Sequence, residues 1–545
     1  MRDRRSLTHR WVWSCAVFAL ILAVLLFLPG PQAALCRTDR LRSAPEPADP
    51  YRPIYHFSPP TNFMNDPNGL IYHRGVYHLF FQYNPRGNAA GNTSWGHATS
   101  TDLVHWQDQP LAIPADPSEQ VWSGSVVFDR TNSSGLGTRR HPPLVAAYTS
   151  FHNGDGRQRQ SLAYSTDHGT TWTKYAHNPV IDIGSKDFRD PKMFWDAERE
   201  RWVMVVALAA EKKTSIYTST NLTTWTHRSN FGPAGAANAV WECPDLFPLT
   251  LHGKQKWVLT LSVAGRTQYF VGDFDGSTYT TAPGSGRRVR WVDHGNDYYA
   301  AVSFNDVPSQ QRLMLGWMSN WDYAQATPTG TWRGQQSIAR QLSLTTDDGT
   351  ASGQPTLVQQ PVGLDAIKGP TTRFQPMTVS GYRRLDVTGS ALRITATLVP
   401  RRARHYGFDV RVGPGQRTRI GYDHAAGELY VDRTRSGDTS FHSGFAGVQR
   451  APLTLHDRPL HLDILVDSSS VEVFADHGRV AISDLIYPDP SSRQISIFTD
   501  RSTVRVQQMT TTSLHRSVPP GRRQPESPSS GRREAPPCTR PLATG

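Results

Sequence analysis

Three carboxylic acids stand in short segments that combine turn-forming, aromatic and apolar residues. They are Asp66 in Asn62-Phe63-Met64-Asn65-Asp66-Pro67-Asn68-Gly69, Asp190 in Phe188-Arg189-Asp190-Pro191, and Glu242 in Trp241-Glu242-Cys243-Pro244. No cation lies beside Asp66 in its segment, so we expect an ionised, unpaired nucleophile. Proline after an acid biases that acid toward extended backbone, so we expect these side chains at strand ends that point into one site. Cleavage of a glycosidic bond needs two such groups, one to donate a proton and one to attack or to activate water.

Six further motifs accompany these acids along the chain. They are Phe81-Gln82-Tyr83-Asn84-Pro85, Trp95-Gly96-His97-Ala98, Trp122-Ser123-Gly124-Ser125, Asp297-Tyr298-Tyr299-Ala300, Gly316-Trp317-Met318-Ser319-Asn320-Trp321 and Ser469-Ser470-Val471-Glu472-Val473-Phe474. With these motifs in this order, residues 51 to 510 resemble the family 32 glycoside hydrolases. That family comprises the invertases, inulinases and levanases, which cleave β-fructofuranosides.

The resemblance implies a role for each acid. Asp66 would be the nucleophile that attacks the anomeric carbon of a fructosyl unit, and Glu242 would be the acid/base, so the mechanism would be retaining. Asp190 would bind the ring hydroxyls and stabilise the transition state, with Arg189 beside it as a fixed donor. The apolar neighbours of Glu242 should raise its pKa.

The resemblance also implies which residues bind the sugar. Trp95, Trp122 and Trp321 would stack on the fructosyl ring. Asn65, Gln82 and Ser123 would bond its hydroxyls. Arg189 would be balanced by Asp190, which favours a neutral substrate over a phosphorylated one.

Two residues need separate comment. Cys243 lies beside an acid, but we expect a small buried packing residue and not a nucleophile. The family's Arg-Glu-Leu stands here as Arg340-Gln341-Leu342, which removes a carboxylate and puts any local ion pair in doubt. The acids show no histidine clustering at metal-ligand spacing, so no metal and no cofactor is predicted.

The fold class predicted from the sequence is all-β. Short runs rich in β-branched and aromatic residues alternate with turn formers. A polar turn followed by tryptophan occurs three times, at Ser100–Trp106, Ser165–Trp172 and Ser219–Trp225, and this spacing suits one propeller blade per repeat. The family resemblance supplies the number of blades, which is five. We therefore predict a five-bladed β-propeller over residues 51–344, a linker over 345–365, a C-terminal β-sandwich over 366–512 and a disordered tail over 513–545.

The first 34 residues predict export. Four arginines precede an apolar run from Trp11 to Leu28, as in a signal peptide, although the run is long enough for an uncleaved membrane anchor. The protein is therefore expected to be secreted, with membrane attachment only if this segment is retained. The net charge of +12 lies largely in the two tails, and no basic-aromatic pattern for nucleic acid is present. The oligomeric state is left open.

The leading hypothesis is a secreted hydrolase of fructans such as levan or inulin, of sucrose, or of both. A fructosyltransferase would use the same covalent intermediate, and an arabinan-cleaving propeller would share the three-carboxylate plan. A fructan-binding protein with a decayed site is the non-enzymatic alternative, which the presence of all three acids disfavours.

Overall fold

A computed structural model describes residues 49–282, 289–347, 350, 353–401, 403–455 and 458–517. The predicted export segment over residues 1–34 lies outside the described residues, as does the part of the predicted tail from residue 518 onward. The predicted start of that tail at residue 513 is wrong, because the last strand continues to Leu514. Within these ranges, none of the helices has the length and apolar character needed to cross a bilayer.

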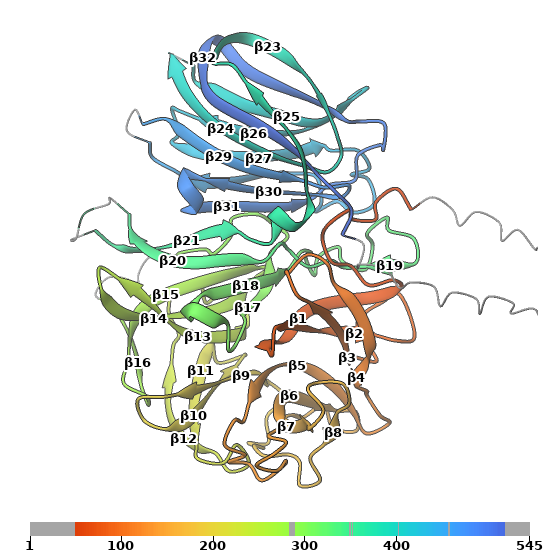
Figure 1. Cartoon of the computed structure of the whole chain (residues 1–545), viewed down its shortest axis with the longest axis vertical. Coiled ribbons are helices and arrows are strands. Elements are labelled where there is room, and N and C mark those ends of the chain that lie inside the picture. Colours follow the sequence, from red (N-terminus) through yellow and green to blue (C-terminus); the bar gives the residue numbers. More distant parts are fainter. Residues whose placement is uncertain are drawn as a thin grey trace, which may run out of the picture. The chain divides into compact units, whose positions relative to one another are not determined.

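Five antiparallel sheets follow one another along the chain from residue 62 to residue 361 (Figure 1). The first holds β1 (Asn62–His73), β2 (Val76–Asn84), β3 (Ser94–Ser100) and β4 (Gln107–Ile113), and the second holds β5 (Glu119–Phe128), β6 (Leu144–His152), β7 (Gln158–Ser165) and β8 (Thr173–Lys174). The third holds β9 (Phe188–Asp196), β10 (Arg201–Leu208), β11 (Lys213–Ser219) and β12 (Thr226–Phe231), and the fourth holds β13 (Glu242–Leu251), β14 (Lys254–Val263), β15 (Arg266–Phe274) and β16 (Tyr279–Thr281). The fifth holds β17 (Tyr299–Ser303), β18 (Arg312–Trp317), β20 (Arg340–Thr346) and β21 (Pro355–Pro361).

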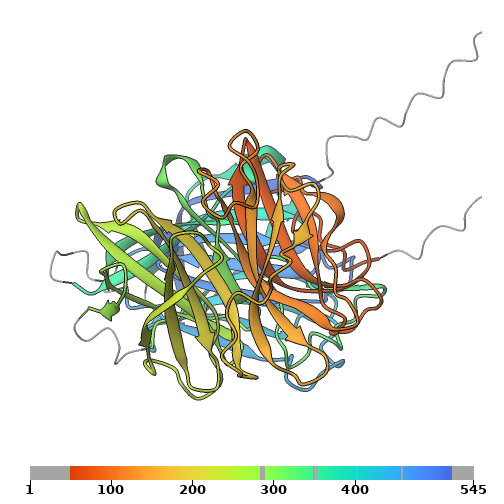
Figure 2. The ribbon, with the colours of Figure 1, turned by 90° about the horizontal axis from the view of Figure 1, so that it is seen from below.

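These sheets are the blades of a closed propeller, which Figure 2 shows from below. The first strand of each blade is innermost, and β1, β5, β9, β13 and β17 contact one another in that order, with β17 returning to β1. The short strand β19 (Trp332–Arg333), from the last part of the propeller, pairs in parallel with β1 of the first blade. The ring is thus closed by hydrogen bonds between its two ends, and closure protects the sheet edges.

The three polar turns that end in tryptophan occupy equivalent positions in the first three blades. Each begins where the third strand ends, at Ser100, Ser165 and Ser219. The indole then closes the turn: for example, Trp106 Nε1 donates to the Leu103 carbonyl oxygen at 3.0 Å and Trp172 and Trp225 make the same type of bond. The interpretation of these segments as blade repeats is confirmed.

The C-terminal part is a sandwich-like sheet of eleven strands. They are β22 (Lys368–Phe374), β23 (Met377–Thr388), β24 (Leu392–Arg401), β25 (His405–Gly413), β26 (Gln416–Asp423), β27 (Glu428–Arg435), β28 (Val448–Pro452), β29 (Leu460–Val466), β30 (Ser470–Ala475), β31 (Val480–Leu485) and β32 (Gln494–Leu514). The long strand β32 pairs with β25 through its first residues and with β24 through its later ones, so it belongs to both layers. Three short 3-10 helices complete the described structure: η1 (Pro308–Gln310), η2 (Leu364–Ile367) and η3 (Asp476–Gly478).

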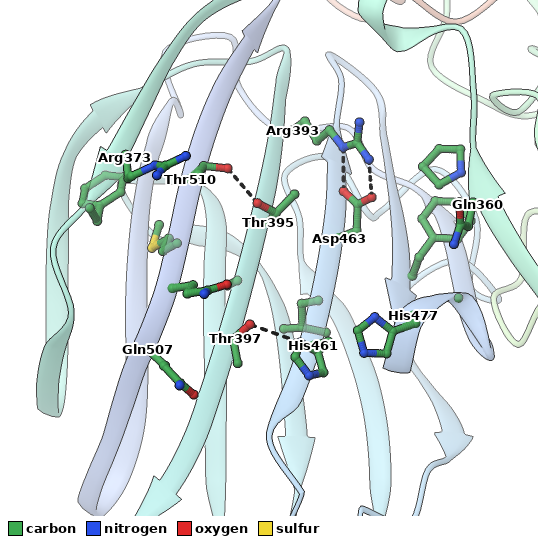
Figure 3. Close-up of a pocket in the computed structure, with 18 of the residues that line it drawn as sticks. Gln360, Arg373, Arg393, Thr395, Thr397, His461, Asp463, His477, Gln507 and Thr510 are labelled. Atoms are coloured by element: carbon green, nitrogen blue, oxygen red, sulfur yellow. Dashed lines mark hydrogen bonds and ion pairs between the residues drawn. The ribbon is translucent and has the colours of Figure 1, made fainter. Parts of the chain in front are cut away.

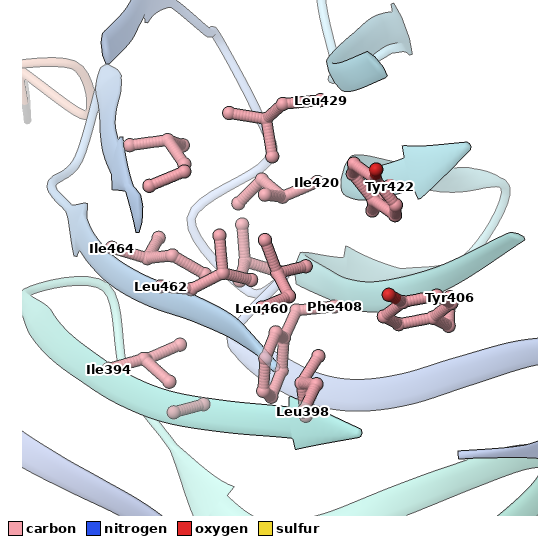
Figure 4. Packing of buried hydrophobic residues seen from close by; sticks show 14 of the residues in the cluster. Ile394, Leu398, Tyr406, Phe408, Ile420, Tyr422, Leu429, Leu460, Leu462 and Ile464 are labelled. Carbon is pink, nitrogen blue, oxygen red and sulfur yellow. The ribbon is translucent and has the colours of Figure 1, made fainter. Parts of the chain in front are cut away.

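Strands β24 and β29 show why this sequence forms a sandwich. Alternate residues such as Ile394, Leu398 and Ile464 are fully buried in the core between the layers (Figure 4). The residues between them face a polar groove of about 750 Å³, where Thr395 bonds Thr510 at 2.7 Å (Figure 3). This period of two, apolar inward and polar outward, is the pattern of a strand with one buried face. The predicted all-β class, with a five-bladed propeller and a β-sandwich, is confirmed.

The predicted linker over residues 345–365 is wrong. Strand β20 continues to Thr346, and β21 pairs with it residue by residue from Arg340 opposite Pro361 to Thr346 opposite Pro355. The turn-rich segment is therefore a hairpin connection within the fifth blade. The glycines and aspartates that suggested a break between domains instead mark a reversal of the chain, because both features use the same turn-forming residues.

A buried ion-pair network joins the fifth blade to the sandwich. Arg340 donates to Asp293 at 2.8 Å and to Glu472 at 2.6 Å, and all three side chains are inaccessible to solvent. The second oxygen of Glu472 lies 2.9 Å from His56 Nε2. Burial lowers the pKa of His56, but hydrogen bonds to its two carboxylate partners outweigh burial and raise the pKa to about 9. The network does not use residue 341, so the glutamine there leaves the ion pairs of Arg340 in place.

We expect Glu472→Gln to lower the free energy of unfolding by about 3–5 kcal/mol, because Arg340 and His56 each lose one of two buried carboxylate partners and their charges are then only partly compensated. Glu428→Gln is the matched control. Glu428 pairs with Arg450 at 3.2 Å on the surface, and such pairs contribute about 0–1 kcal/mol. Denaturant titration of both variants measures the difference, and equal losses would contradict a structural role for the buried network.

Candidate active site

The innermost strand of every blade carries an extra residue, and β1 carries a second one between Asn68 and Ile71. At each such point the innermost strand advances by three residues while the strand paired with it advances by two. The β-bulges common to all five blades lie between Met64 and Pro67, Val121 and Gly124, Arg189 and Lys192, Glu242 and Asp245, and Tyr299 and Val302. Because a bulge bends the strand and re-aims its side chains, five bulges around one ring bring side chains from all five blades together.

Two bulge residues at the site have left-handed backbone, with φ of +67° at Asp190 and +47° at Cys243. The prediction that proline holds each acid in extended backbone is therefore wrong for Asp190. Its conformation is fixed by two hydrogen bonds: its N–H donates to Thr149 Oγ1 at 2.8 Å, and its Oδ2 accepts from the Cys243 N–H at 2.9 Å. The bulge overrides the local preference that the following proline imposes.

Asp66 is held by three polar side chains and a thiol. Its Oδ2 accepts hydrogen bonds from Ser123 Oγ at 2.6 Å and Gln82 Nε2 at 3.1 Å, and its Oδ1 accepts from Asn65 Nδ2 at 3.1 Å. Cys243 Sγ lies 3.5 Å from the same Oδ2. Within the described ranges no cation pairs with Asp66. The carboxylate is oriented without being neutralised, as a nucleophile requires.

Burial is the main influence on the pKa values of Asp66 and Asp190. It raises the pKa of Asp66 to about 6, against a lowering effect of the Ser123 hydrogen bond and with a further raising effect of Glu242. Burial likewise raises the pKa of Asp190; Arg189 opposes the rise, whereas the charges of Glu242 and Asp66 reinforce it. Like charges held close in a buried site raise one another's pKa.

Glu242 pairs with Arg189, which among the described residues is the one guanidinium in contact with the three acids. Arg189 Nε and Nη2 both lie 3.0 Å from Glu242 Oε1, and the Tyr299 hydroxyl donates to Glu242 Oε2. Arg189 Nη1 donates to Gln158 Oε1 at 3.1 Å. The predicted balance of Arg189 by Asp190 is wrong at the level of contacts, because no ion pair joins them in the described structure.

The predicted apolar setting of Glu242 is also wrong. Trp241 is fully buried, and its indole points away into the core, where Nε1 donates to the Ala236 carbonyl oxygen at 2.8 Å. Neighbours in a strand face opposite sides, so residues adjacent to Glu242 in sequence do not surround its carboxylate. Arg189 and Tyr299, which do, are remote in sequence.

Comparison with known proteins places this ring of acids in a family. Residues 56–361 match the family model "Glycosyl hydrolases family 32 N-terminal domain", and residues 364–513 match "Glycosyl hydrolases family 32 C terminal". The chain belongs to glycosyl hydrolase family 32.

Relatives in this family are similar over most of their length. The levanase of Bacillus subtilis is 45% identical over 481 residues, covering 84% of this chain and 70% of the levanase. The extracellular exo-inulinase of Aspergillus niger is 42% identical over 487 residues, covering 81% of this chain and 90% of that protein. The solved structure of the exo-inulinase of Aspergillus awamori superposes with a TM-score of 0.80 at 38% identity, covering 86% of this chain and 99% of the other. The family 32 protein described here is therefore a glycoside hydrolase.

The three tryptophans predicted to stack on sugar occupy different environments in this family 32 enzyme. Trp95 is fully buried and donates from Nε1 to the Trp122 carbonyl oxygen at 2.9 Å, so its predicted role as a platform is wrong. Trp122 is partly exposed and stacks on Phe151, with ring centroids 4.5 Å apart. Trp321 is 43% exposed and stacks on Phe63 of β1, with ring centroids 6.0 Å apart. Trp122 and Trp321 alone of the three present accessible rings.

Sequence reasoning missed three residues of the family 32 site. Tyr299 belongs to a motif that was noted but was given no role, and Thr149 carries no local signal at all. Cys243 is buried, as expected, but it also lies between two acids, with Sγ 3.5 Å from Asp66 Oδ2 and 3.6 Å from Asp190 Oδ2. Burial, together with the nearby carboxylates, raises the pKa of the Cys243 thiol well above its usual range, so the thiol stays protonated and acts as a weak donor.

We expect Asp66→Asn to stabilise this family 32 enzyme at neutral pH. The native pKa of about 6 exceeds the usual value of 3.8. At a pH between these two values, Asp66 is therefore protonated in the native state and ionised in the unfolded chain. Stability therefore falls as pH rises from about 4 to 6, and above pH 6 the penalty reaches about 3 kcal/mol. The amide carries no such penalty.

Unfolding measured at pH 7.5 and again toward pH 4 tests this expectation. The gain in the free energy of unfolding should be largest at pH 7.5 and should fall toward zero near pH 4. Asp386→Asn, at an exposed carboxylate of the sandwich, is the control and should show no such trend. A pH-independent effect of Asp66→Asn would mean that burial of its charge is not the cause.

Proposed function

We propose that this glycoside hydrolase is a secreted, retaining enzyme that removes terminal β-D-fructofuranosyl residues from levan, inulin or sucrose. The observation that carries the proposal is that two carboxylates, Asp66 and Glu242, have different hydrogen-bond partners. Asp66 is oriented by Ser123, Gln82 and Asn65 without any cation. Glu242 is bonded by Arg189 and Tyr299. Two carboxyl groups in different environments supply the two roles that retention needs.

In the proposed reaction Glu242 donates a proton to the glycosidic oxygen while Asp66 attacks the anomeric carbon. The bond to the leaving sugar breaks and a covalent fructosyl enzyme forms. Glu242 then takes a proton from water, which attacks the same carbon and releases Asp66. Two displacements at one carbon retain its configuration.

Asp190 is assigned to the transition state. Its backbone and one of its oxygens are fixed by Thr149 and Cys243, so its carboxylate is preorganised to bind ring hydroxyls as positive charge develops on the sugar. Asn65, Gln82 and Ser123 would share their hydrogen bonds between Asp66 and the sugar. Trp122 and Trp321, with their accessible rings, would stack on its apolar face.

The substrate class and location rest on the relatives. One is a levanase and another an extracellular exo-inulinase, which supports fructans as substrates, exo action and secretion through residues 1–34. Among the described residues, the one cation in contact with the three acids is Arg189, and it is already paired with Glu242, which supports a neutral sugar.

Incubation of the purified enzyme with sucrose, inulin and levan, with products resolved by chain length over time, tests the proposed function. Free fructose should be the first product from each polymer. A ladder of oligosaccharides at early times would contradict exo action. Products longer than the substrate at high sucrose concentration would indicate transfer to sugar, and no cleavage of any of the three would contradict the fructosidase assignment.

Glu242→Ala tests the division of roles. It should slow cleavage of sucrose by several orders of magnitude, because that leaving group needs a proton. An aryl fructoside, whose leaving group needs little protonation, should be affected much less in the first step. The fructosyl enzyme should then accumulate, and azide should restore turnover and give a β-fructosyl azide, since a small anion needs no base.

Asp66→Asn is the matched variant. It removes the nucleophile, so it should be inactive on both substrates and should not respond to azide. An α-configured azide product from Glu242→Ala would contradict retention. Equal losses on both substrates without azide rescue would mean that Glu242 positions the sugar and does not donate the proton.

A further inference from the structure

Trp195 is an exposed aromatic residue far from the acids. It lies near the end of β9, the strand whose third residue is Asp190. Five residue steps separate the two, or about 17 Å at the usual rise. Trp195 therefore lies toward the opposite end of its propeller strand from the active site.

The indole of Trp195 is fixed but not covered. It pairs across the sheet with Trp202, and the two rings meet edge to face with centroids 4.9 Å apart. Trp202 is itself buried and anchored, since its Nε1 donates to Ser133 Oγ at 2.9 Å. Trp195 nevertheless remains 43% exposed. A large ring held rigidly at the surface loses little conformational entropy when a ligand packs on it.

A cavity of about 360 Å³ adjoins this ring. Aromatic side chains make much of its wall, among them Phe194 and Trp257, and charged side chains make the rest, with Asp306 and Arg312 among them. This volume, with apolar walls and a few polar groups, is typical of small-molecule sites, which span about 300–1,000 Å³.

Arg312 contributes a guanidinium to the wall of this cavity. Its Nη1 donates to the Phe304 carbonyl oxygen at 3.1 Å, which holds the side chain in place. Guanidinium N–H groups at a cavity wall can donate to the hydroxyl oxygens of a ligand.

We propose that Trp195 and the adjoining cavity form a second carbohydrate-binding site, which takes a short segment of a fructan chain away from the catalytic acids. A neutral sugar has an apolar C–H face for the indole and a rim of hydroxyls for the arginine and aspartate. Its function would be to hold the polymer while the acids cleave its end, which lowers the KM for long fructans and leaves sucrose unaffected. The identity of the sugar rests on the proposed function.

Calorimetric titration of the full chain with inulin-type oligosaccharides tests this site. The parent protein is Asp66→Asn, which prevents turnover. It should bind two ligands per chain, and adding Trp195→Ala should reduce this to one. Trp195→Phe, which keeps a smaller ring, should retain the second site with weaker affinity. Tyr382→Ala is the control, because Tyr382 is an aromatic residue 54% exposed on the sandwich, and it should leave both sites intact.

The same substitutions in the active enzyme give a second readout. Trp195→Ala should raise the KM for inulin and levan about five- to tenfold, the loss expected for one aromatic contact, with kcat/KM for sucrose unchanged. If the enzyme hydrolyses fructan but every variant binds one ligand per chain, the second site is wrong and the proposed function stands. The same conclusion follows if Trp195→Ala leaves the KM for polymers unchanged. Fructan binding that depends on Trp195 without any hydrolysis would overturn the proposed function alone.

Discussion

The close grouping of three carboxylates beside one guanidinium, with two of the three buried, is the constraint on which this structure depends. Asp66 and Asp190 are more than nine-tenths buried, whereas Glu242 is partly exposed. Among the described residues, Arg189 is the one cation in contact with these acids, and it pairs with Glu242. Asp66 and Asp190 are consequently left with raised pKa values and with hydrogen bonds in place of counterions. Such an arrangement opposes folding, so it persists only where the surrounding structure over-determines it.

The propeller supplies the surrounding structure that holds the acids in place. Each acid lies on a different blade, and every innermost strand is held by its own sheet as well as by its two neighbours in the ring. Pairing of β19 with β1 closes the ring, so the blades cannot separate to relieve the repulsion. The buried pairs of Arg340 with Asp293 and Glu472 add the sandwich to the same unit. The sandwich thereby stiffens a catalytic domain to which it contributes none of the three acids.

The acids themselves could be predicted from the sequence, because each lies within a short contiguous motif that can be read directly from the chain. Contacts that cross between blades could not. Arg189 stands next to Asp190 in the chain but pairs with Glu242, since adjacent residues in a strand face opposite ways. Trp95 stands in a motif but is buried by the packing of two blades.

The architecture shows the same division. Repeated turns ending in tryptophan revealed the blades, because each turn is a local unit closed by its own indole. The five bulges left no comparable local signal, since a bulge is defined by the strand opposite. The linker was misplaced for a related reason: a hairpin loop between β20 and β21 has the composition of a domain boundary. Register and packing, not composition, decide these features.

Cys243 shows how the site keeps two acids apart in function although they are close in space. Its thiol lies 3.5 Å from Asp66 and 3.6 Å from Asp190, and its backbone N–H bonds Asp190 alone. A thiol is a weak donor, so it separates the two carboxylates without stabilising either charge strongly. The backbone bond, by contrast, ties one oxygen of Asp190 to the ring. In the proposed reaction, Asp190 would thereby be fixed as a charge that stabilises the transition state, whereas Asp66, held by side chains that can also bond a sugar, would form and break the covalent bond.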